Sequence, residues 1–212
     1  MTDLQFTTEY GAEFVEESDS YFSAELIMNC ISEVRQTNPK WNDYYLGVDF
    51  ARLGEDSSVF TIVQRTIETG KCEVLEIIET KGKRLTDAVG RIKMLDEKYH
   101  FKKVILDETG MGSGPTDFLL EDFAGRIEPV TFTVKSKMDI YSNLKVIMEK
   151  GLLKYAENKK LIYQLRDLRY EAMSSGQLKI HHSERGHDDY TDSIALACWP
   201  IKGMRKLNWV IG

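Results

Sequence analysis

Two kinds of hydrophobic pattern alternate along this chain. Short apolar runs rich in β-branched and aromatic residues, bounded by Gly, Asp and Thr turns, indicate strands. Longer stretches with an apolar residue every three or four positions indicate helices. The expected strands cover residues 44–50, 57–65, 72–80, 103–107, 128–134 and 178–181, and residues 152–155 form a short strand or a turn. The expected helices cover residues 24–36, 86–99, 115–124, 136–149, 159–173 and 190–199, and Ser23, Thr86 and Ser136 stand where N-caps belong.

The order of these elements predicts the fold class. Short turns join the first three strands, so they form an antiparallel meander. After these strands, helices and strands alternate, which is typical of a sheet covered by helices. We therefore expect an α/β fold with a mixed sheet flanked by helices on both faces.

Four aspartates stand at the ends of these elements. Asp49 and Asp107 close apolar strand runs, whereas Asp189 and Asp192 open an apolar helical run. Carboxylates that converge at a sheet edge repel one another, and a divalent cation among them relieves the repulsion. Oxygen ligands alone favour Mg²⁺ or Mn²⁺. The pattern therefore indicates a two-metal site that cleaves phosphodiesters.

Three aspartates at the start of the last helix are candidate metal ligands. Asp189 and Asp192 are three residues apart, and Asp188 and Asp192 are four apart, so either pair shares a helix face. A helix N-terminus favours a carboxylate by about 0.3–1 kcal/mol without any metal, so one of the three could be only a cap. We rank Asp189 first as a metal ligand, followed by Asp188 and Asp192. Glu108 is a weaker candidate than Asp107, because the next residue on a strand points to the other face.

Charge is distributed unevenly. The net charge is −6, but residues 1–43 hold nine acids and two bases, and residues 44–212 hold 25 acids and 26 bases. We therefore divide the chain into an acidic leading segment with one helix, 1–43, and a folded domain, 44–212. Lysines of the second part, with Lys135 and Lys137 as candidates, could contact phosphates, although a solvated surface explains such charges equally well.

Other polar residues carry weaker signals. Asp56 in a turn and His187 before the helical aspartates are candidates for contacts just outside the direct metal ligands. His181 and His182 lack a zinc-binding spacing, and we interpret them as solvated or packed histidines. Three scattered cysteines suggest free thiols in a reducing compartment. No apolar run approaches the roughly 20 residues of a membrane span, and the first residues lack the pattern of a signal peptide.

Three motifs resemble one family. They are Gly47-Val-Asp49 through Val59, Leu106-Asp107 through Gly112, and Gly186-His-Asp188-Asp189-Tyr-Thr-Asp192 through Ala197. Together with Val134–Lys137 and Tyr141–Leu144, they resemble the nuclease domain of the viral large terminase subunit, which has a ribonuclease H-like fold. The resemblance covers about residues 44–200. Two leading stretches, Glu9–Phe14 and Phe22–Ile27, are similar to that family's connector between its ATPase and nuclease domains.

The resemblance implies a function. It implies a metal-dependent endonuclease that cuts concatemeric viral double-stranded DNA with little sequence specificity. Asp49 would bridge two divalent ions, Mg²⁺ or Mn²⁺, and Asp107 and the Asp188, Asp189 and Asp192 group would complete the site. The implied partners are the ATPase domain of the large terminase, the small terminase subunit and the portal. The implied location is the host cytoplasm, with the protein absent from the mature virion and from membranes.

The chain departs from a whole large terminase in one respect. Gly110-Met-Gly112-Ser-Gly114 lacks the lysine and hydroxyl of a phosphate-binding loop, and we interpret it as a tight strand-to-helix turn. The chain therefore resembles only the nuclease half, as a fragment or a separate product.

Three other functions compete with a packaging nuclease. A Holliday-junction resolvase on the same fold also pairs two helical aspartates three residues apart. A non-catalytic, metal-stabilised interaction module of a packaging motor would bind metal without cutting DNA. An ATPase on the related actin-like fold would need a second phosphate loop, which the sequence lacks.

Overall fold

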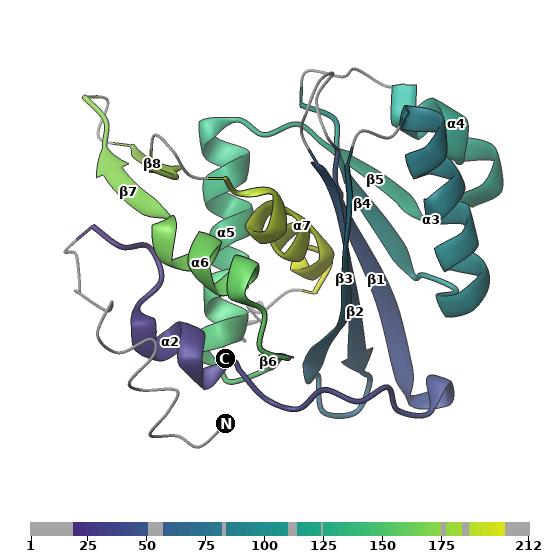
Figure 1. Ribbon diagram of the computed structural model, residues 1–212, viewed down its shortest axis with the longest axis horizontal. Helices are drawn as coiled ribbons and strands as arrows, with labels where there is room; N and C mark the ends of the chain where they lie inside the picture. The colour runs from purple at the N-terminus through teal and green to yellow at the C-terminus, as the bar shows by residue number, and fades with distance from the viewer. Residues whose placement is uncertain are drawn as a thin grey trace, which may run out of the picture.

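A six-stranded mixed sheet forms the centre of the computed structural model (Figure 1). The structure describes residues 19–50, 57–81, 84–109, 114–123, 125–174, 177–183 and 187–201. The strands are β1 (Asn42–Asp49), β2 (Ser57–Thr66), β3 (Cys72–Lys81), β4 (Lys103–Asp107), β5 (Ile127–Val130) and β6 (Leu153–Tyr155), with a separate hairpin of β7 (Arg169–Ala172) and β8 (Leu178–His181). The helices are α2 (Ala24–Asn29), α3 (Leu85–Tyr99), α4 (Gly114–Phe123), α5 (Val134–Glu149), α6 (Lys159–Asp167) and α7 (Asp189–Cys198), with a short 3₁₀ turn η1 (Pro39–Trp41).

The strand order is β5-β4-β1-β2-β3-β6, and the pairings confirm the expected mixed sheet. β1, β2 and β3 form the antiparallel meander. β4 pairs parallel to β1, β5 parallel to β4, and β6 parallel to β3. β1 consequently lies inside the sheet, with a parallel neighbour on one side and an antiparallel neighbour on the other.

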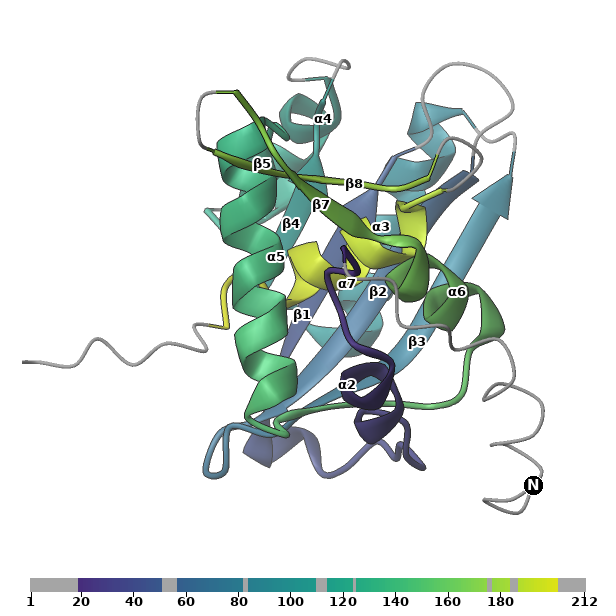
Figure 2. The same ribbon diagram turned by 90° about the vertical axis from the view of Figure 1, so that its left-hand side faces the viewer.

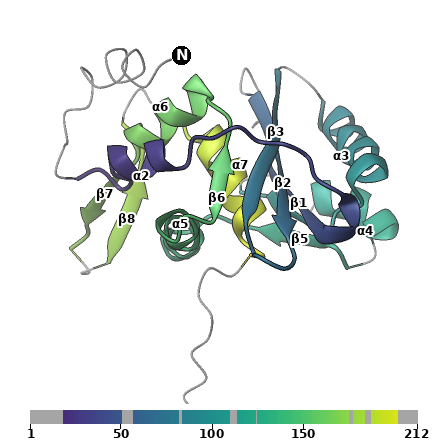
Figure 3. The same cartoon turned by 90° about the horizontal axis from the view of Figure 1, so that it is seen from below.

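Helices cover both faces of the sheet, as expected. α3 and α4 lie on one face, and α7 lies against the other with α5, α6 and α2 outside it (Figures 1 and 3). Each face of the sheet has its own hydrophobic core. Successive residues of β1 point into these two cores in turn, because side chains alternate along a strand. Tyr45 joins the core under α7, whereas Leu46 and Val48 join the core under α3.

A glycine sets how closely α7 approaches the sheet. A Cβ atom on Gly47 would lie 2.1 Å from the carbonyl oxygen of Ser193 and 2.3 Å from the amide nitrogen of Ala197. Only glycine therefore fits at this crossing. Thr61 on β2 adds a buried hydroxyl contact of 2.7 Å to Ser193. These contacts fix the position of α7 against β1 and β2.

The first expected helix, 24–36, is wrong in its second half. α2 ends at Asn29. The amide of Tyr155 donates to the Cys30 carbonyl at 3.0 Å, and the amide of Ser32 donates to the Tyr155 carbonyl at 2.9 Å. Pairing with β6 satisfies the backbone in an extended form, so tertiary contacts override the helical pattern.

The expected helix 159–173 is also wrong beyond residue 167. α6 ends at Asp167, and β7 pairs antiparallel with β8. Buried Leu168 ends the helix and enters the core. The hairpin crosses over α5 and lies away from the main sheet (Figure 2).

Two expected caps and one strand end differ as well. Thr133 caps α5 in place of Ser136, and the two side chains form a reciprocal capping box. α3 begins at Leu85, before Thr86. β5 ends at Val130, because its partner β4 ends at the paired residue Asp107.

The leading segment contributes to the core. Tyr21, Phe22 and Ile27 are buried in the cluster that also holds α5 and α7. The division at residue 43 stays a prediction. All three cysteines are buried and free. None of the helices in the described part of the chain has the length and apolarity of a membrane span.

Candidate active site

Two of the predicted aspartates end neighbouring strands. Val48 and Leu106 are register partners in the parallel β1–β4 pair. Asp49 and Asp107, the next residues, therefore lie at the same carboxyl edge of the sheet. Carboxyl edges of parallel strands are where α/β proteins build their sites.

Helix α7 brings the other aspartates to this edge. Asp188 occupies the N-cap position, but its side chain forms no capping hydrogen bond. The backbone amides of Tyr190 and Thr191 instead donate to Gln164 Oε1, at 2.8 and 3.3 Å. The Asp188 carboxylate therefore faces the site without serving as a cap.

One open cleft of about 350 Å³ collects these side chains. Its lining residues come from β1, β2, β4, the segment before α5, α5 itself, the segment after β8 and the start of α7. They are Asp49, Phe50, Ser57, Asp107, Thr109, Phe132, Lys137, His182, His187, Asp188, Asp189 and Asp192. Five carboxylates thus share one cleft with one lysine.

Lys137 enters the cleft from α5. Its ammonium lies 2.5 Å from Asp188 Oδ2 and 3.2 Å from Asp192 Oδ2. The rings of Phe132 and Tyr141 lie 5.2 and 5.6 Å from the same nitrogen. The Tyr141 hydroxyl donates to Asp192 Oδ1 at 2.5 Å. Asp192 therefore has both oxygens engaged, and Lys137 neutralises part of the acidic cluster.

Burial and repulsion shape the acidity of the cluster. Burial first, and then the charges of Asp192, Asp107, Asp189 and Asp188, raise the pKa of Asp49 well above its usual range. Burial raises the pKa of Asp192 to about 7, although Lys137 opposes the rise. Burial also disfavours the charged form of Asp188, but the Lys137 charge and hydrogen bond leave its pKa below the usual value. Lys137 thus acts on Asp188 and Asp192, whereas the other aspartates of the cleft add to the repulsion that raises the pKa of Asp49.

Asp107 is held in place by the residue that follows the strand. The amide and hydroxyl of Thr109 both donate to Asp107 Oδ1, at 2.8 and 2.5 Å. The Thr109 hydroxyl oxygen accepts from the Phe132 amide at 2.8 Å. Glu108 points elsewhere, and its carboxylate accepts from the amide and hydroxyl of Thr116 at the start of α4. Only Asp107 of this pair lines the cleft, as the strand alternation predicts.

The cleft offers the type of ligand atom that a divalent cation prefers. Oxygen ligands from Asp49, Asp107 and Asp189 suit a hard cation, and the raised pKa of Asp49 shows that added positive charge would be favourable there. As the side chains stand, however, no three acidic, histidine or cysteine residues within the described ranges form a ready metal cage. A bound ion therefore requires side-chain rotation into the cleft.

The structure places most of the predicted site residues together, but not all. Asp49, Asp107, Asp188, Asp189, Asp192, Lys137 and His187 line the cleft. Lys135 lies on the exposed side of α5, paired with Asp139 at 2.6 Å. Asp56 lies outside the described residues. The roles of all these residues stay predictions.

Sequence reasoning missed several contributors. His182 was interpreted as a solvated or packed histidine, yet it lines the cleft, as do Ser57 and Thr109. Tyr141 and Gly47 position Asp192 and α7. Their only sequence signal was their presence in the quoted motifs, because the partner residues lie about 50 to 150 positions away.

Comparison with known proteins agrees with this geometry. The model of the terminase RNaseH-like domain family matches residues 46–198. The large terminase subunit of Thermus phage G20c is 35% identical over 212 residues, which cover 95% of this chain and 42% of that protein. This chain therefore spans less than half the length of that relative.

Solved structures give the same result. The crystal structure of the large terminase nuclease from thermophilic phage G20c with bound magnesium has a TM-score of 0.70 and 29% identity, covering 86% of this chain and 97% of that one. The form with bound cobalt has a TM-score of 0.69 and 30% identity over the same shares. Since the family model spans well over half of the sequence, the chain belongs to the terminase RNase H-like domain family.

Proposed function

We propose that this chain is the metal-dependent endonuclease domain of a viral packaging terminase, and that it cuts concatemeric duplex DNA with little sequence preference. The observation that carries the proposal is the meeting of Asp49, Asp107 and Asp189, from β1, β4 and α7, in one cleft. Family membership supports the assignment. So do the magnesium and cobalt bound to the related nuclease of phage G20c.

The proposed ligands are the carboxylates that Lys137 does not hold. Asp49 stands at the centre, because its charge is disfavoured by all four other aspartates. Asp107 and Asp189 would complete the ligand set on either side of it. Two Mg²⁺ or Mn²⁺ ions, when bound, would supply an activated water and stabilise the departing 3′ oxygen.

The remaining cleft residues have supporting roles. Lys137 ties Asp188 to Asp192, and Tyr141 fixes Asp192 from the other side. These contacts keep the start of α7 rigid and limit the negative charge that an incoming phosphodiester meets. Thr109 orients Asp107 by two hydrogen bonds. Rigid placement of this kind favours catalysis, because misplacement by about 1 Å can cost about a hundredfold in rate.

The partners follow from the same proposal. A packaging nuclease works beside an ATPase domain, a small terminase subunit and a portal. The matched large terminase subunit of Thermus phage G20c is more than twice as long as this chain, so it has room for a further domain.

A cleavage assay tests the proposal. Supercoiled plasmid is incubated with the chain in Mg²⁺, Mn²⁺, Ca²⁺ or chelator. We expect nicked or linear product with Mn²⁺ or Mg²⁺ and none with Ca²⁺ or chelator, because the larger and more flexible Ca²⁺ shell loses the reactive geometry. Equal cutting in chelator would exclude a metal-dependent mechanism.

Two further substrates separate the alternatives. A strong preference for four-way junctions over linear duplex would indicate a resolvase. Metal-dependent melting without any cleavage would indicate a non-catalytic interaction module.

A further inference from the structure

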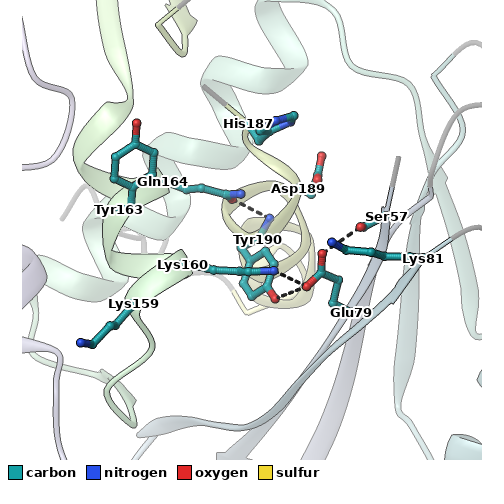
Figure 4. Close-up of a pocket in the computed structure, with 10 residues that line it drawn as sticks. All are labelled: Ser57, Glu79, Lys81, Lys159, Lys160, Tyr163, Gln164, His187, Asp189 and Tyr190. Atoms are coloured by element: carbon teal, nitrogen blue, oxygen red, sulfur yellow. Dashed lines mark hydrogen bonds and ion pairs between the residues drawn. The ribbon is translucent and has the colours of Figure 1, made fainter. Parts of the chain in front are cut away.

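A second groove opens directly beside the cleft. It has a volume of about 480 Å³ and lies between the end of β3, the start of α6 and the start of α7 (Figure 4). Ser57, His187 and Asp189 line both the groove and the cleft. The groove and the cleft are therefore adjacent, and these three residues lie at their common border.

Lysines dominate the charge of this groove. Lys81, Lys159 and Lys160 line it. Lys160 pairs with Glu79, whose carboxylate also accepts from the Ser57 hydroxyl at 2.8 Å and the Tyr190 hydroxyl at 3.0 Å. The charge of Glu79 is thus already satisfied. Lys81 and Lys159 are exposed and form no ion pair with any described residue.

A buried amide adds a fixed donor to the wall. The Gln164 side chain is only 7% exposed, and its Oε1 accepts from the amides of Tyr190 and Thr191. These two bonds fix which end of the amide is oxygen. The opposite atom, Nε2, has no acceptor among the described residues and stays in the groove wall (Figure 4).

An aromatic ring completes the groove. Tyr163 lines it from α6 with 59% of its surface exposed. An exposed tyrosine beside lysines is suited to contact a sugar or base next to a phosphate. Two unpaired ammonium groups, a fixed amide donor and an exposed ring together match a sugar–phosphate chain better than an isolated small anion.

We propose that this groove, lined by Lys81, Lys159, Tyr163 and Gln164, binds the backbone of the nucleic-acid strand on one side of the scissile phosphate. The inference rests on the proposed nuclease function and adds to it the direction in which one strand leaves the cleft. Lys81 and Lys159, which lie on opposite sides of the groove (Figure 4), each contact a phosphate, and Gln164 Nε2 donates to a phosphate oxygen nearer the aspartates.

Duplex binding at a series of salt concentrations tests the groove. The whole chain, in Ca²⁺ to separate binding from cutting, is titrated into a labelled duplex and followed by fluorescence anisotropy. The test variant is Lys81→Gln with Lys159→Gln. The matched control is Lys40→Gln with Lys71→Gln, which removes the same charge from the opposite end of the sheet, beside η1 and the β2–β3 turn.

The expected result is specific to the groove. Loss of two phosphate contacts should weaken binding by roughly tenfold or more at low salt and reduce the log–log salt slope by about 1.8. The control pair should keep the wild-type slope. Gln164→Glu, which retains the acceptor for α7 but replaces the donor with a charge, should also weaken binding at a temperature at which circular dichroism shows the variant folded. Inorganic phosphate at constant ionic strength should not displace the duplex.

The outcomes separate this inference from the proposed function. If the wild type binds and cuts duplex but the groove pair matches its control in affinity and slope, the groove is not on the DNA path. Displacement of the duplex by inorganic phosphate would instead make it a small-anion site and overturn the inference. If the wild type neither binds nor cuts duplex under any condition, the proposed function itself fails.

Discussion

The ammonium of Lys137 lies 2.5 Å from the carboxylate of Asp188, inside a cleft that four more aspartates share. The pair joins α5 to the start of α7. Lys137 is therefore an internal counterion for part of the acidic cluster, and it separates Asp188 and Asp192, which it contacts, from the other three aspartates of the cleft.

Removing this counterion should destabilise the metal-free protein. The Lys137 side chain is 18% exposed, and Lys137→Gln leaves the buried Asp192 and the partly buried Asp188 without their partner. We expect a loss of about 2–4 kcal/mol in chelator, because an uncompensated buried charge is costly. Added Mn²⁺ should recover more stability in the variant than in the wild type. Urea unfolding with and without Mn²⁺ measures both effects.

Lys135→Gln is the matched control for that experiment. Lys135 is on the same helix, but its side chain is 82% exposed and its ion pair with Asp139 lies at the surface. We expect a change within about 0.5 kcal/mol. Equal losses in both variants would show that Lys137 acts only as a surface charge.

Neutralising the central aspartate should have the opposite effect on the metal-free protein. Burial and four neighbouring carboxylates disfavour the charge of Asp49. Asp49→Asn should therefore melt in chelator at the wild-type temperature or above it, with a gain of about 1 kcal/mol. Asp139→Asn, on the exposed side of α5, should give no gain. A clear drop in melting temperature for Asp49→Asn would make Asp49 a structural residue.

The close approach of α7 to β1 gives a third prediction. Gly47→Ala places a Cβ atom 2.1 Å from the Ser193 carbonyl oxygen, so the helix must move. We expect a loss of about 3 kcal/mol or more in stability and a strong loss of cutting. Gly90→Ala, in α3 with open space around the added atom, should instead stabilise by about 0.4–1 kcal/mol. Similar effects at both positions would contradict the account of the crossing.

The groove carboxylate Glu79 gives a prediction about pH. The hydrogen bond from Lys160, with others from Ser57 and Tyr190, lowers the pKa of Glu79 to about 2. A lowered folded-state pKa contributes stability above the ordinary value, and this contribution is lost as pH falls toward about 2. The stability difference between wild type and Glu79→Gln should therefore be about 1–2 kcal/mol near neutral pH and shrink steadily below about pH 4.5. Urea unfolding over that range measures it, and a difference that grows on acidification would refute the assignment.

The sequence allowed much of the fold to be predicted because its strong patterns are local. Strand 103–107 was predicted with its observed bounds, since its apolar run is short and flanked by polar residues. Helices 24–36 and 159–173 were predicted too long. The second half of the first pairs with β6, and the second half of the other pairs with β8, which come from other parts of the chain. A helical period cannot reveal such competition.

The residues of the candidate site also fall into those that the sequence predicts and those that it does not. Carboxylates at strand ends and at a helix start have a recognisable pattern, and the cleft brings Asp49, Asp107 and Asp189 together. The partner of Asp188 and Asp192 could not be assigned from sequence, because Lys137 lies 51 and 55 residues away and resembles other surface lysines. Gln164 in the groove wall gave no signal at all, since its position depends on the packing of α6 against α7.

One measurement tests the central claim most directly. Plasmid cleavage in Mn²⁺ is followed over time for the wild type, Asp49→Asn and the surface control Lys71→Gln, purified identically. If the cleft of Asp49, Asp107 and Asp189 holds the ions that cut DNA, wild type and Lys71→Gln will convert the plasmid at similar rates, and Asp49→Asn will lose at least about a hundredfold in rate while remaining folded. Wild-type rates from folded Asp49→Asn would contradict the claim and move the active site elsewhere.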